Sequence, residues 1–207
     1  MFDLHIHTCY SLDGNEKPED IIKFLRKKGF KGAAIVDHNT LRGAMKVIKE
    51  EKFLIIPGME IKTKKGHILA IGIKEEIKSK EIGEIIEEIH EKGGIAIIAH
   101  PFRFSKPKIK ADGIEAINGR CYPKQNREAI RFAIKNNIPY TAGSDAHYMW
   151  EMGKVYTKMN AESIDDAIDE ILKKRVEIGR NTSFWHPLKC QIYSLSSFIK
   201  RGFRRVD

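Results

Sequence analysis

The stretch MFDLHIHTCYSLDG, residues 1–14, decides the fold class, because a short apolar run ends there in side chains that can bind a metal ion. The apolar pattern predicts a buried strand over residues 2–6. Side chains two residues apart in a strand point the same way, so His5 and His7 can share one ion. Asp13 follows six residues later as a further potential ligand. We therefore expect a first strand that leads directly into a metal site.

Outward from this stretch, short apolar runs alternate with longer amphipathic segments. The pattern predicts strands at 2–6, 32–36, 53–56, 67–73, 95–99, 113–117 and 139–142, and helices at 18–29, 40–51, 80–93, 123–137 and 163–175. Because the strands are continuously apolar and alternate with helices, we expect a parallel sheet covered by helices. About seven strands favour a closed or nearly closed barrel over an open sheet.

Length and composition are those of one globular domain: 207 residues, 42% hydrophobic and 31% charged. No apolar run is long enough to span a bilayer, and no secretory signal precedes the first strand, so we expect a cytoplasmic protein. The three cysteines are far apart, which argues against disulfides or a cysteine zinc site. The net charge of +9 favours phosphorylated or polyanionic partners, although a lysine-rich thermophilic surface has the same charge without binding anything.

Four further apolar runs also end in potential ligands. These ligands are His38, Glu60, His100, and Asp145 with His147. The C-terminal ends of barrel strands meet at one mouth, where active sites form. Glu60 lies close in sequence to His67, which starts the next strand, and could bridge two ions. Asp37 faces away from His38 in a regular strand, so we expect it to support a ligand instead.

Nine side chains thus form the expected metal site: His5, His7, Asp13, His38, Glu60, His67, His100, Asp145 and His147. Their nitrogen and oxygen donors suit Zn, Mn or Fe. A single catalytic zinc ion usually takes three protein ligands, so nine indicate two or three divalent ions. Such sites characteristically hydrolyse phosphate esters. We interpret His90, on a helix, and His186, near the C-terminus, as ordinary residues.

The segments that carry these ligands resemble, in order, the four motifs of the PHP (polymerase and histidinol phosphatase) family. They are residues 5–8 with 11–14, 37–40, 58–60, 99–102 and 143–147. The resemblance runs from residue 2 to about residue 180 and implies an α/β fold, a distorted, TIM-barrel-like (β/α)7 barrel with its active site at the C-terminal ends of the strands. It also implies a trinuclear site. One ion would bind His5, His7, Glu60 and Asp145, a second Glu60, His67 and His100, and a third Asp13, His38 and His147.

The resemblance further implies phosphoester hydrolysis by a metal-bound hydroxide, without a covalent enzyme intermediate. We expect a nucleotide or the 5′ end of a nucleic acid as substrate. Arginine binds phosphate oxygens as a fork, and Arg103 and Arg120 lie at the expected active face. Asn39 and Asn118 can add hydrogen bonds to the substrate. The general acid stays open between His38, His147 and a metal-bound water.

Three alternatives remain. An amidohydrolase barrel also begins with two histidines on its first strand, but Asp13, the Glu60–His67 pair and the short chain point away from it. A small-molecule phosphatase, such as a histidinol-phosphatase, has the same ligands. A non-catalytic, nucleic-acid-binding PHP-like subunit would lack a complete ligand set, whereas this sequence has one.

We expect residues 1–184 to form the phosphoesterase domain and residues 185–207 a basic C-terminal tail. In the tail, Leu188, Ile192, Leu195, Ile199 and Phe203 recur at helical spacing, among Lys189, Lys200, Arg201, Arg204 and Arg205. This pattern predicts a helix docked on the barrel by its apolar side. The alternative is a basic amphipathic segment that touches RNA or an anionic membrane. The oligomeric state is open.

Overall fold

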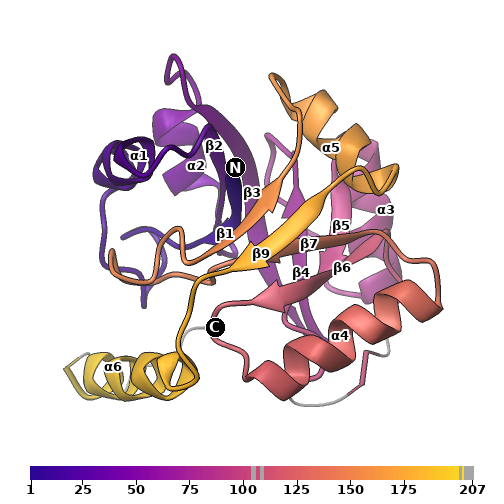
Figure 1. Ribbon diagram of the computed structural model, residues 1–207. Helices are drawn as coiled ribbons and strands as arrows, with labels where there is room; N and C mark the ends of the chain where they lie inside the picture. The colour runs from indigo at the N-terminus through magenta and orange to yellow at the C-terminus, as the bar shows by residue number, and fades with distance from the viewer. Residues whose placement is uncertain (104–105, 108–109, 201, 203–207) are drawn as a thin grey trace.

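The computed structural model describes residues 1–103, 106–107, 110–200 and 202 (Figure 1). Its strands are β1 (Phe2–Ile6), β2 (Gly32–His38), β3 (Leu54–Thr63), β4 (Gly66–Ile71), β5 (Ile95–Ile98), β6 (Gly113–Asn118), β7 (Tyr140–Gly143), β8 (Val155–Lys158) and β9 (Glu177–Arg180). Its helices are α1 (Pro18–Lys27), α2 (Arg42–Val47), α3 (Ile82–Glu91), α4 (Pro123–Lys135), α5 (Ile164–Leu172) and α6 (His186–Lys200). The α/β fold predicted from the sequence is confirmed.

The strands form one strongly curved sheet in the order β7-β6-β5-β4-β3-β2-β1-β8-β9. The chain after β7 returns to β1: the His7 amide donates to the Ala146 carbonyl at 2.9 Å, and the Asp145 amide donates to the His5 carbonyl at 2.8 Å. These bonds nearly close the sheet into a barrel, with helices on its outside (Figure 1). They also bring the two ends of the ligand-bearing sequence together.

The sheet is mixed, not parallel as we expected. β3 and β4 form an antiparallel hairpin in which Thr63 pairs with Gly66, and β4 is also antiparallel to β5. Only two residues connect β3 to β4, and a parallel pair needs a crossover of a dozen residues or more. As a consequence, the start of β4 lies beside the end of β3. His67 therefore reaches the same mouth as the strand ends although it begins a strand.

Strands β8 and β9 were not among the predicted strands. Each has four residues, and they pair antiparallel with one another. β8 joins the sheet through a bridge between Thr157 and Phe2. The Thr157 side chain also bonds to β7, accepting from the Ala142 amide and donating to its carbonyl, both at 2.9 Å. Neither contains a continuous apolar run such as the one by which the equally short β5 was recognised.

Helix ends follow local signals. Pro18 begins α1, Glu19 and Asp20 fill its first turn, and Gly29 follows its end with a φ of 79°. At α5, the Asp166 amide donates to Ser163 Oγ at 3.1 Å while the Ser163 amide donates to Asp166 Oδ2 at 3.0 Å. Together these two bonds form a capping box at the start of α5.

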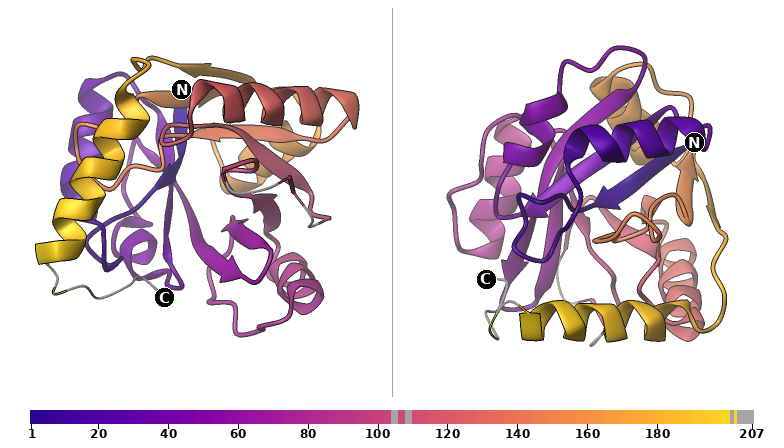
Figure 2. Two further views of the ribbon diagram at one scale, coloured as in Figure 1. Left: turned by 90° about the horizontal axis from the view of Figure 1, so that it is seen from below. Right: turned by 90° about the vertical axis from the view of Figure 1, so that its left-hand side faces the viewer.

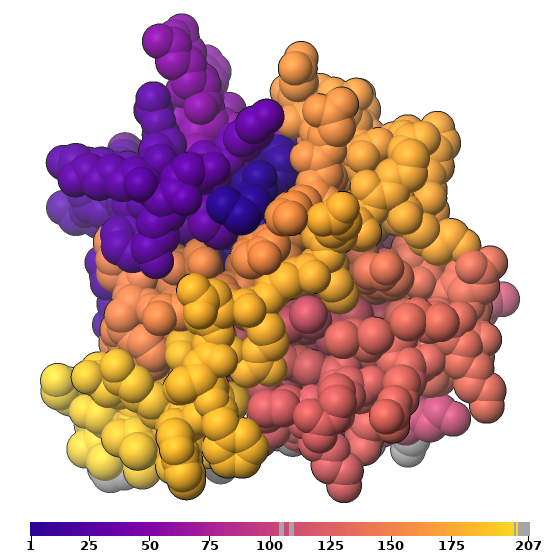
Figure 3. Space-filling view, viewed as in Figure 1, coloured from indigo at the N-terminus to yellow at the C-terminus, as the bar shows by residue number. Residues whose placement is uncertain are grey.

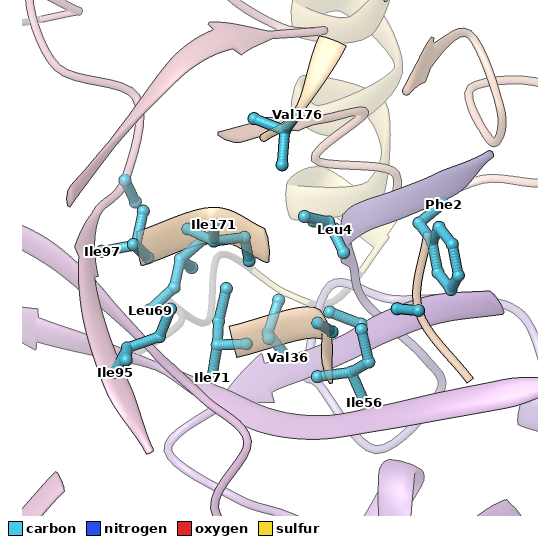
Figure 4. Packing of buried hydrophobic residues seen from close by; sticks show 14 residues of the cluster. Phe2, Leu4, Val36, Ile56, Leu69, Ile71, Ile95, Ile97, Ile171 and Val176 are labelled. Carbon is cyan, nitrogen blue, oxygen red and sulfur yellow. The ribbon is translucent and has the colours of Figure 1, made fainter. Parts of the chain in front are cut away.

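The apolar interior of the barrel lies along the same strands that carry the polar cluster. Figure 4 shows one group of buried residues: Phe2, Leu4, Val36, Ile56, Leu69, Ile71, Ile95, Ile97, Ile171 and Val176. On β3, Ile56 belongs to this core and Glu60, an even number of residues later, points to the same side nearer the strand end. Between them a Cβ on Gly58 would lie 2.3 Å from the Ala70 carbonyl oxygen, so only glycine allows β4 this close.

Helix α6 packs on the body by a different face from the predicted one. His186, Pro187 and Cys190 are buried, whereas the apolar residues of the predicted stripe are 40–59% exposed: Leu188, Ile192, Leu195 and Ile199. Figures 2 and 3 show the helix (yellow) at the edge of the molecule. The remaining tail residues of that pattern lie outside the described residues: Arg201, Phe203, Arg204 and Arg205. Within the described chain, no helix has the length and apolarity needed to cross a membrane.

Candidate metal centre

All nine side chains expected at the metal site lie together at the mouth of the barrel. His5 and His38 lie at or next to the ends of β1 and β2, Glu60 lies in β3 near its end, and His67 is the second residue of β4. The remaining ligands follow β1, β5 and β7: His7, Asp13, His100, Asp145 and His147. Potential ligand atoms lie within 4.8 Å of one another in three groups: His7, His38 and His147; His5, His7 and Asp145; Glu60, His67 and His100.

Glu60 lies at the centre of the cluster and is 1% exposed. Its carboxylate oxygens are 2.7 Å from His67 Nδ1, 3.0 Å from His100 Nε2, 3.1 Å from His7 Nε2, 3.3 Å from His5 Nε2 and 3.5 Å from His38 Nδ1. Burial raises the pKa of Glu60, but the neighbouring histidines outweigh it and hold the pKa well below the usual range. A carboxylate ringed by ring nitrogens in this way can bridge two cations.

His5 and His7 face each other through their Nε2 atoms, 3.1 Å apart. Asp145 Oδ1 lies 3.7 Å from the first and 3.6 Å from the second. Burial lowers the pKa of His7, but hydrogen bonds to Asp145 and Glu60 outweigh it and raise the pKa to about 9. The two rings are therefore surrounded by negative charge of the kind that a bound cation would neutralise.

Asp13 contacts the cluster beside His147 and His38. Its Oδ2 is 3.0 Å from His147 Nε2 and 3.7 Å from His38 Nε2. Its Oδ1 is buried and has no hydrogen-bond partner, which is unusual for a carboxylate in a folded protein. His147 Nδ1 lies 2.9 Å from the Asp145 carbonyl oxygen. Because a carbonyl only accepts, Nδ1 carries a proton, and Nε2 is the ring atom that faces the Asp13 carboxylate and that a cation between them would bind.

The backbone is strained at two of these positions. Asp145 has a φ of 55° and His100 a φ of 31°, in the left-handed region that non-glycine residues seldom adopt. Hydrogen bonds compensate at both: the Asp145 amide donates to the His5 carbonyl and the His100 amide donates to Glu115 Oε2 at 2.8 Å. Strain held in this way is concentrated at functional sites in proteins.

Glu115, which the sequence did not single out, orients the cluster from β6. Its Oε1 accepts from His5 Nδ1 at 3.0 Å, and its Oε2 accepts from the His100 amide and from Asn118 Nδ2 at 2.9 Å. With the His5 proton fixed on Nδ1, Nε2 is left as the donor atom that faces the cluster. The signal in the sequence was a single acidic residue within the apolar strand GIEAIN.

Asp37 takes the supporting position that we expected for it. It accepts hydrogen bonds from the Thr8 amide at 2.6 Å, the Thr8 hydroxyl at 2.7 Å and the Ser11 hydroxyl at 2.9 Å. Ser11 Oγ in turn lies 3.3 Å from His7 Nδ1. A Cβ on Gly43 would lie 2.0 Å from the Asp37 carboxylate, so α2 can pass this close only with glycine there.

The two arginines expected to bind substrate differ in burial and in their hydrogen-bond partners. Arg103 is half-buried, and its Nη1 donates to Asp145 Oδ2 at 3.2 Å. Arg120 is 7% exposed and its guanidinium donates to Glu151, 2.9 Å from Oε1, and to the hydroxyl of Ser194 on α6 at 3.0 Å. Glu151 was also missed from the sequence.

Asn118 and Asn39 differ in exposure. Asn118 is buried and donates to Asp145 Oδ2 at 3.2 Å. Asn39 is exposed, and its backbone amide donates to the Glu60 carbonyl at 3.1 Å.

The two histidines that we interpreted as ordinary both lie outside the cluster. His90 is exposed and lies 2.8 Å from Asp112. His186 is buried against the Trp150 ring, 5.4 Å away, and burial lowers its pKa to about 4.

A cavity of about 240 Å³ opens onto the cluster. Its lining comprises Asp13, His38, Glu60, Lys62, His67, His100, Arg103, Arg120, Asp145 and His147. Seven of the nine expected ligands and both arginines therefore border one space. The cavity is the size of a small anionic group with part of its leaving group, and its walls hold both the acidic and histidine donors and two guanidinium groups.

Comparison with known proteins gives two family matches. Residues 3–122 match the model of the PHP domain, and residues 123–176 match the PHP-associated model. An uncharacterized protein of Methanocaldococcus jannaschii, MJ1587, is 39% identical over 140 residues, which cover 56% of this chain and 80% of that protein.

Two solved structures share the fold. A two-domain protein from Bacteroides vulgatus, containing a predicted PHP-like metal-dependent phosphoesterase, superposes with a TM-score of 0.73 at 19% identity over 86% of this chain. The lesion-specific endonuclease PfuEndoQ from Pyrococcus furiosus superposes with a TM-score of 0.59 at 16% identity, also over 86% of this chain. The chain spans 64% and 57% of their respective lengths.

Proposed function

Because this chain belongs to the PHP domain family, we propose that it is a metal-dependent phosphoesterase whose active site is the nine-residue cluster at the barrel mouth. The observation that carries this proposal is the centre of the cluster. A fully buried glutamate is ringed by five imidazoles, and a second buried carboxylate lies beside two of them. Fold stability alone gives no reason to bury so many ionisable groups together.

The donor set fits divalent ions. It contains only imidazole nitrogens and carboxylate oxygens, which suit Zn, Mn or Fe. The unpartnered Asp13 Oδ1 and the facing Nε2 atoms of His5 and His7 are both arrangements that a cation would satisfy. We propose two or three ions: one held by His5, His7, Glu60 and Asp145, one by Glu60, His67 and His100, and one by Asp13, His38 and His147. His7 also lies with His38 and His147 and is a further candidate for the last site.

When bound, such ions polarise phosphate oxygens and lower the pKa of a water molecule. The chain's own residues then position the ester. Arg103 reaches the cavity from the loop after β5 and can bind a phosphate oxygen through the guanidinium edge that now faces Asp145. Arg120 is fixed by Glu151 and contributes a rigid positive charge at the cavity wall. Asn118 orients the Asp145 carboxylate and lies too deep to touch substrate.

His147 is better suited to metal binding than to proton donation. Its ring proton is on Nδ1 and is directed at a backbone carbonyl, so Nε2 has none to give to a leaving group. Burial and the nearby Arg120 charge lower the pKa of His147, which keeps the ring neutral. Of these two histidines, His38 is the more exposed at the cavity, so it would be the better placed to meet a leaving group when it does not hold an ion.

We propose a nucleotide or the 5′ end of a nucleic acid as the substrate class. The net charge of +9 and the fold shared with a lesion-specific endonuclease support it. A small phosphorylated metabolite, as in a histidinol-phosphatase, is the second candidate, because a cavity of about 240 Å³ also accommodates a compact monoester.

The test uses two variants, His7→Ala and Asp145→Asn, with His90→Ala as the control, since His90 is an exposed histidine outside the cluster. Each protein is reconstituted with Mn²⁺ or Zn²⁺ and assayed on bis-p-nitrophenyl phosphate, and its metal content is measured by mass spectrometry. We expect both cluster variants to lose metal and turnover while their circular dichroism is unchanged. Turnover and metal content equal to those of the His90→Ala control would refute the proposal.

A further inference from the structure

A second cavity, of about 360 Å³, adjoins the metal centre. It lies between the β3–β4 hairpin and the chain that follows β5. Its lining includes Lys62, Lys64, Lys65, His67, His100 and Lys106. Three of these residues also line the cavity of the metal centre: Lys62, His67 and His100. The two cavities therefore meet along a shared wall.

Lys62 stands where the cavities meet, and strand geometry explains why. It follows Glu60 by two residues on β3, so both side chains point to the same side of the sheet. In the antiparallel register Lys62 pairs with His67, and directly opposite residues have neighbouring side chains. An ammonium group is thus carried next to an imidazole of the metal cluster, on the side that leads to the second cavity.

The hairpin turn that presents the other lysines is firmly built. The Thr63 hydroxyl donates to the Gly66 carbonyl at 2.6 Å and accepts from the Lys65 amide at 3.2 Å. Gly66 has a φ of 131°, which side chains do not tolerate. Lys64 and Lys65 therefore stand on a fixed turn. The ion pair of Lys64 with Glu81, at 3.6 Å, joins two exposed side chains and does little to neutralise the charge.

Among the residues that the structure describes, the lining of this cavity contains four lysines and no acidic residue. Lysines are frequent throughout the chain, so their number alone would mean little. Other cavities of the described chain mix both charges, however. The one beside Phe30 includes Glu50 and Glu162 among its lysines, and the one at α3 is lined by four glutamates. A uniformly basic cavity joined to a phosphoesterase centre is what a second phosphate group of the substrate requires.

We propose that the lysine cavity binds the phosphodiester group next to the scissile one, so that the substrate is a single nucleic-acid strand running from the metal centre over His67 and His100. This inference rests on the proposed function, because it takes the metal centre as the place of the scissile phosphate. Lysine binds phosphate as a point charge without reading a base, so recognition is independent of sequence. A mononucleotide at the metal centre reaches Lys62 on the shared wall and leaves Lys64, Lys65 and Lys106 unused.

The test measures binding without turnover. A 5′-phosphorylated trinucleotide with a 3′ fluorophore is titrated with the full chain in EDTA, and anisotropy is followed from 0.05 to 0.3 M salt. In the double variant Lys62→Ala/Lys65→Ala, the contact to this one phosphodiester group is lost, so we expect the salt slope to fall by about 0.7 and binding to weaken about tenfold at 0.15 M salt. Lys23→Ala/Lys27→Ala, on the exposed side of α1, removes the same charge and is the matched control.

An equal loss of affinity and salt slope in both double variants, or no loss in either, would refute the proposal that the lysine cavity binds a phosphodiester group. Inorganic tripolyphosphate is the competitor. If it displaces the labelled trinucleotide with an affinity equal to that of the trinucleotide itself, the cavity binds a small polyphosphate, and the proposal of a nucleic-acid strand is refuted. A second arm uses the metal-loaded enzyme and compares kcat/KM for the trinucleotide with that for the mononucleotide. We expect the ratio to fall about tenfold in Lys62→Ala/Lys65→Ala. If no form of the protein hydrolyses any ester, the proposed function fails while the binding arm still decides the cavity.

Discussion

Replacing Glu115 by glutamine should weaken metal binding although Glu115 belongs to none of the three ligand groups. Its Oε1 accepts the proton of His5 Nδ1 at 3.0 Å, and its Oε2 accepts from the His100 amide at 2.8 Å. A glutamine that keeps its oxygen on the His100 amide turns its NH2 group towards His5. The ring proton must then move to Nε2, the atom that faces His7 and Glu60, and His5 loses the lone pair it would donate.

The opposite orientation of the glutamine is no better. Its NH2 group would then face the His100 amide and the Asn118 side chain, which are donors themselves. Outer carboxylates of this kind contribute about 10–100-fold to metal affinity, which corresponds to about 1.4–2.7 kcal/mol. We therefore expect Glu115→Gln to raise the dissociation constant for Zn²⁺ or Mn²⁺ by that factor.

Calorimetric titration with a competing chelator measures the affinity, and circular dichroism checks that the variant is folded. The control is Glu84→Gln on α3, an exposed glutamate that loses the same charge far from the cluster. Wild-type affinity in a folded Glu115→Gln protein would refute the idea that this hydrogen bond sets the His5 tautomer. An equal loss in Glu84→Gln would attribute the effect to overall charge instead.

Three further predictions concern buried charge. Burial lowers the pKa of His7, but Asp145 and Glu60 raise it to about 9, so the metal-free protein is protonated there at pH 7 and an ion must displace that proton. Metal affinity should rise about tenfold per unit between pH 7 and 9, and proton release should be seen by calorimetry in buffers of different ionisation enthalpy. The raised pKa of His7 also stabilises the metal-free fold, fully below pH 6.5 and less as the pH rises through 9. Urea denaturation at a series of pH values should show this decrease in the free energy of unfolding. Glu151→Gln should leave the buried Arg120 guanidinium without its counter-charge. We expect the free energy of unfolding, measured by urea denaturation, to fall by about 3–5 kcal/mol. A change below about 1 kcal/mol would show that Ser194 and solvent are enough to stabilise the guanidinium.

Much of the architecture was predictable because its signals are local. The apolar runs located β1, β2 and β4 to β7 within two residues, whereas β3 extends seven residues beyond its predicted end, and Pro18 and Ser163 located the starts of α1 and α5. The direction of β4 was not predictable from the same pattern, since a buried strand looks alike in either direction. The two-residue connection between Thr63 and Gly66 excludes a crossover, but only the structure shows it, because the predicted strand ended at residue 56.

Helix α6 shows where local pattern failed. Its apolar spacing predicted a face docked on the barrel, yet Leu188, Ile192, Leu195 and Ile199 are exposed. The opposite side of the helix carries the contacts: Cys190 is buried and Ser194 accepts from Arg120. Periodicity predicts a helix with an apolar side, and it cannot say whether that side is turned towards the rest of the chain.

The sequence by itself determined the kinds of residue at the barrel mouth, and with them the family. Alternation along a strand and the position of polar residues at strand ends are short-range properties, so nine candidate ligands were predicted and all nine lie together. Their role as ligands stays a prediction. Only the tertiary structure decided which groups hold them: Glu115 lies 110 residues from His5, and Asp37 lies 29 from Thr8. It also paired Arg120 with Glu151 and placed Lys62 beside His67. Hydrogen bonds and charge pairs act over a few ångströms in space whatever the distance along the chain, so no short pattern in the sequence specifies them.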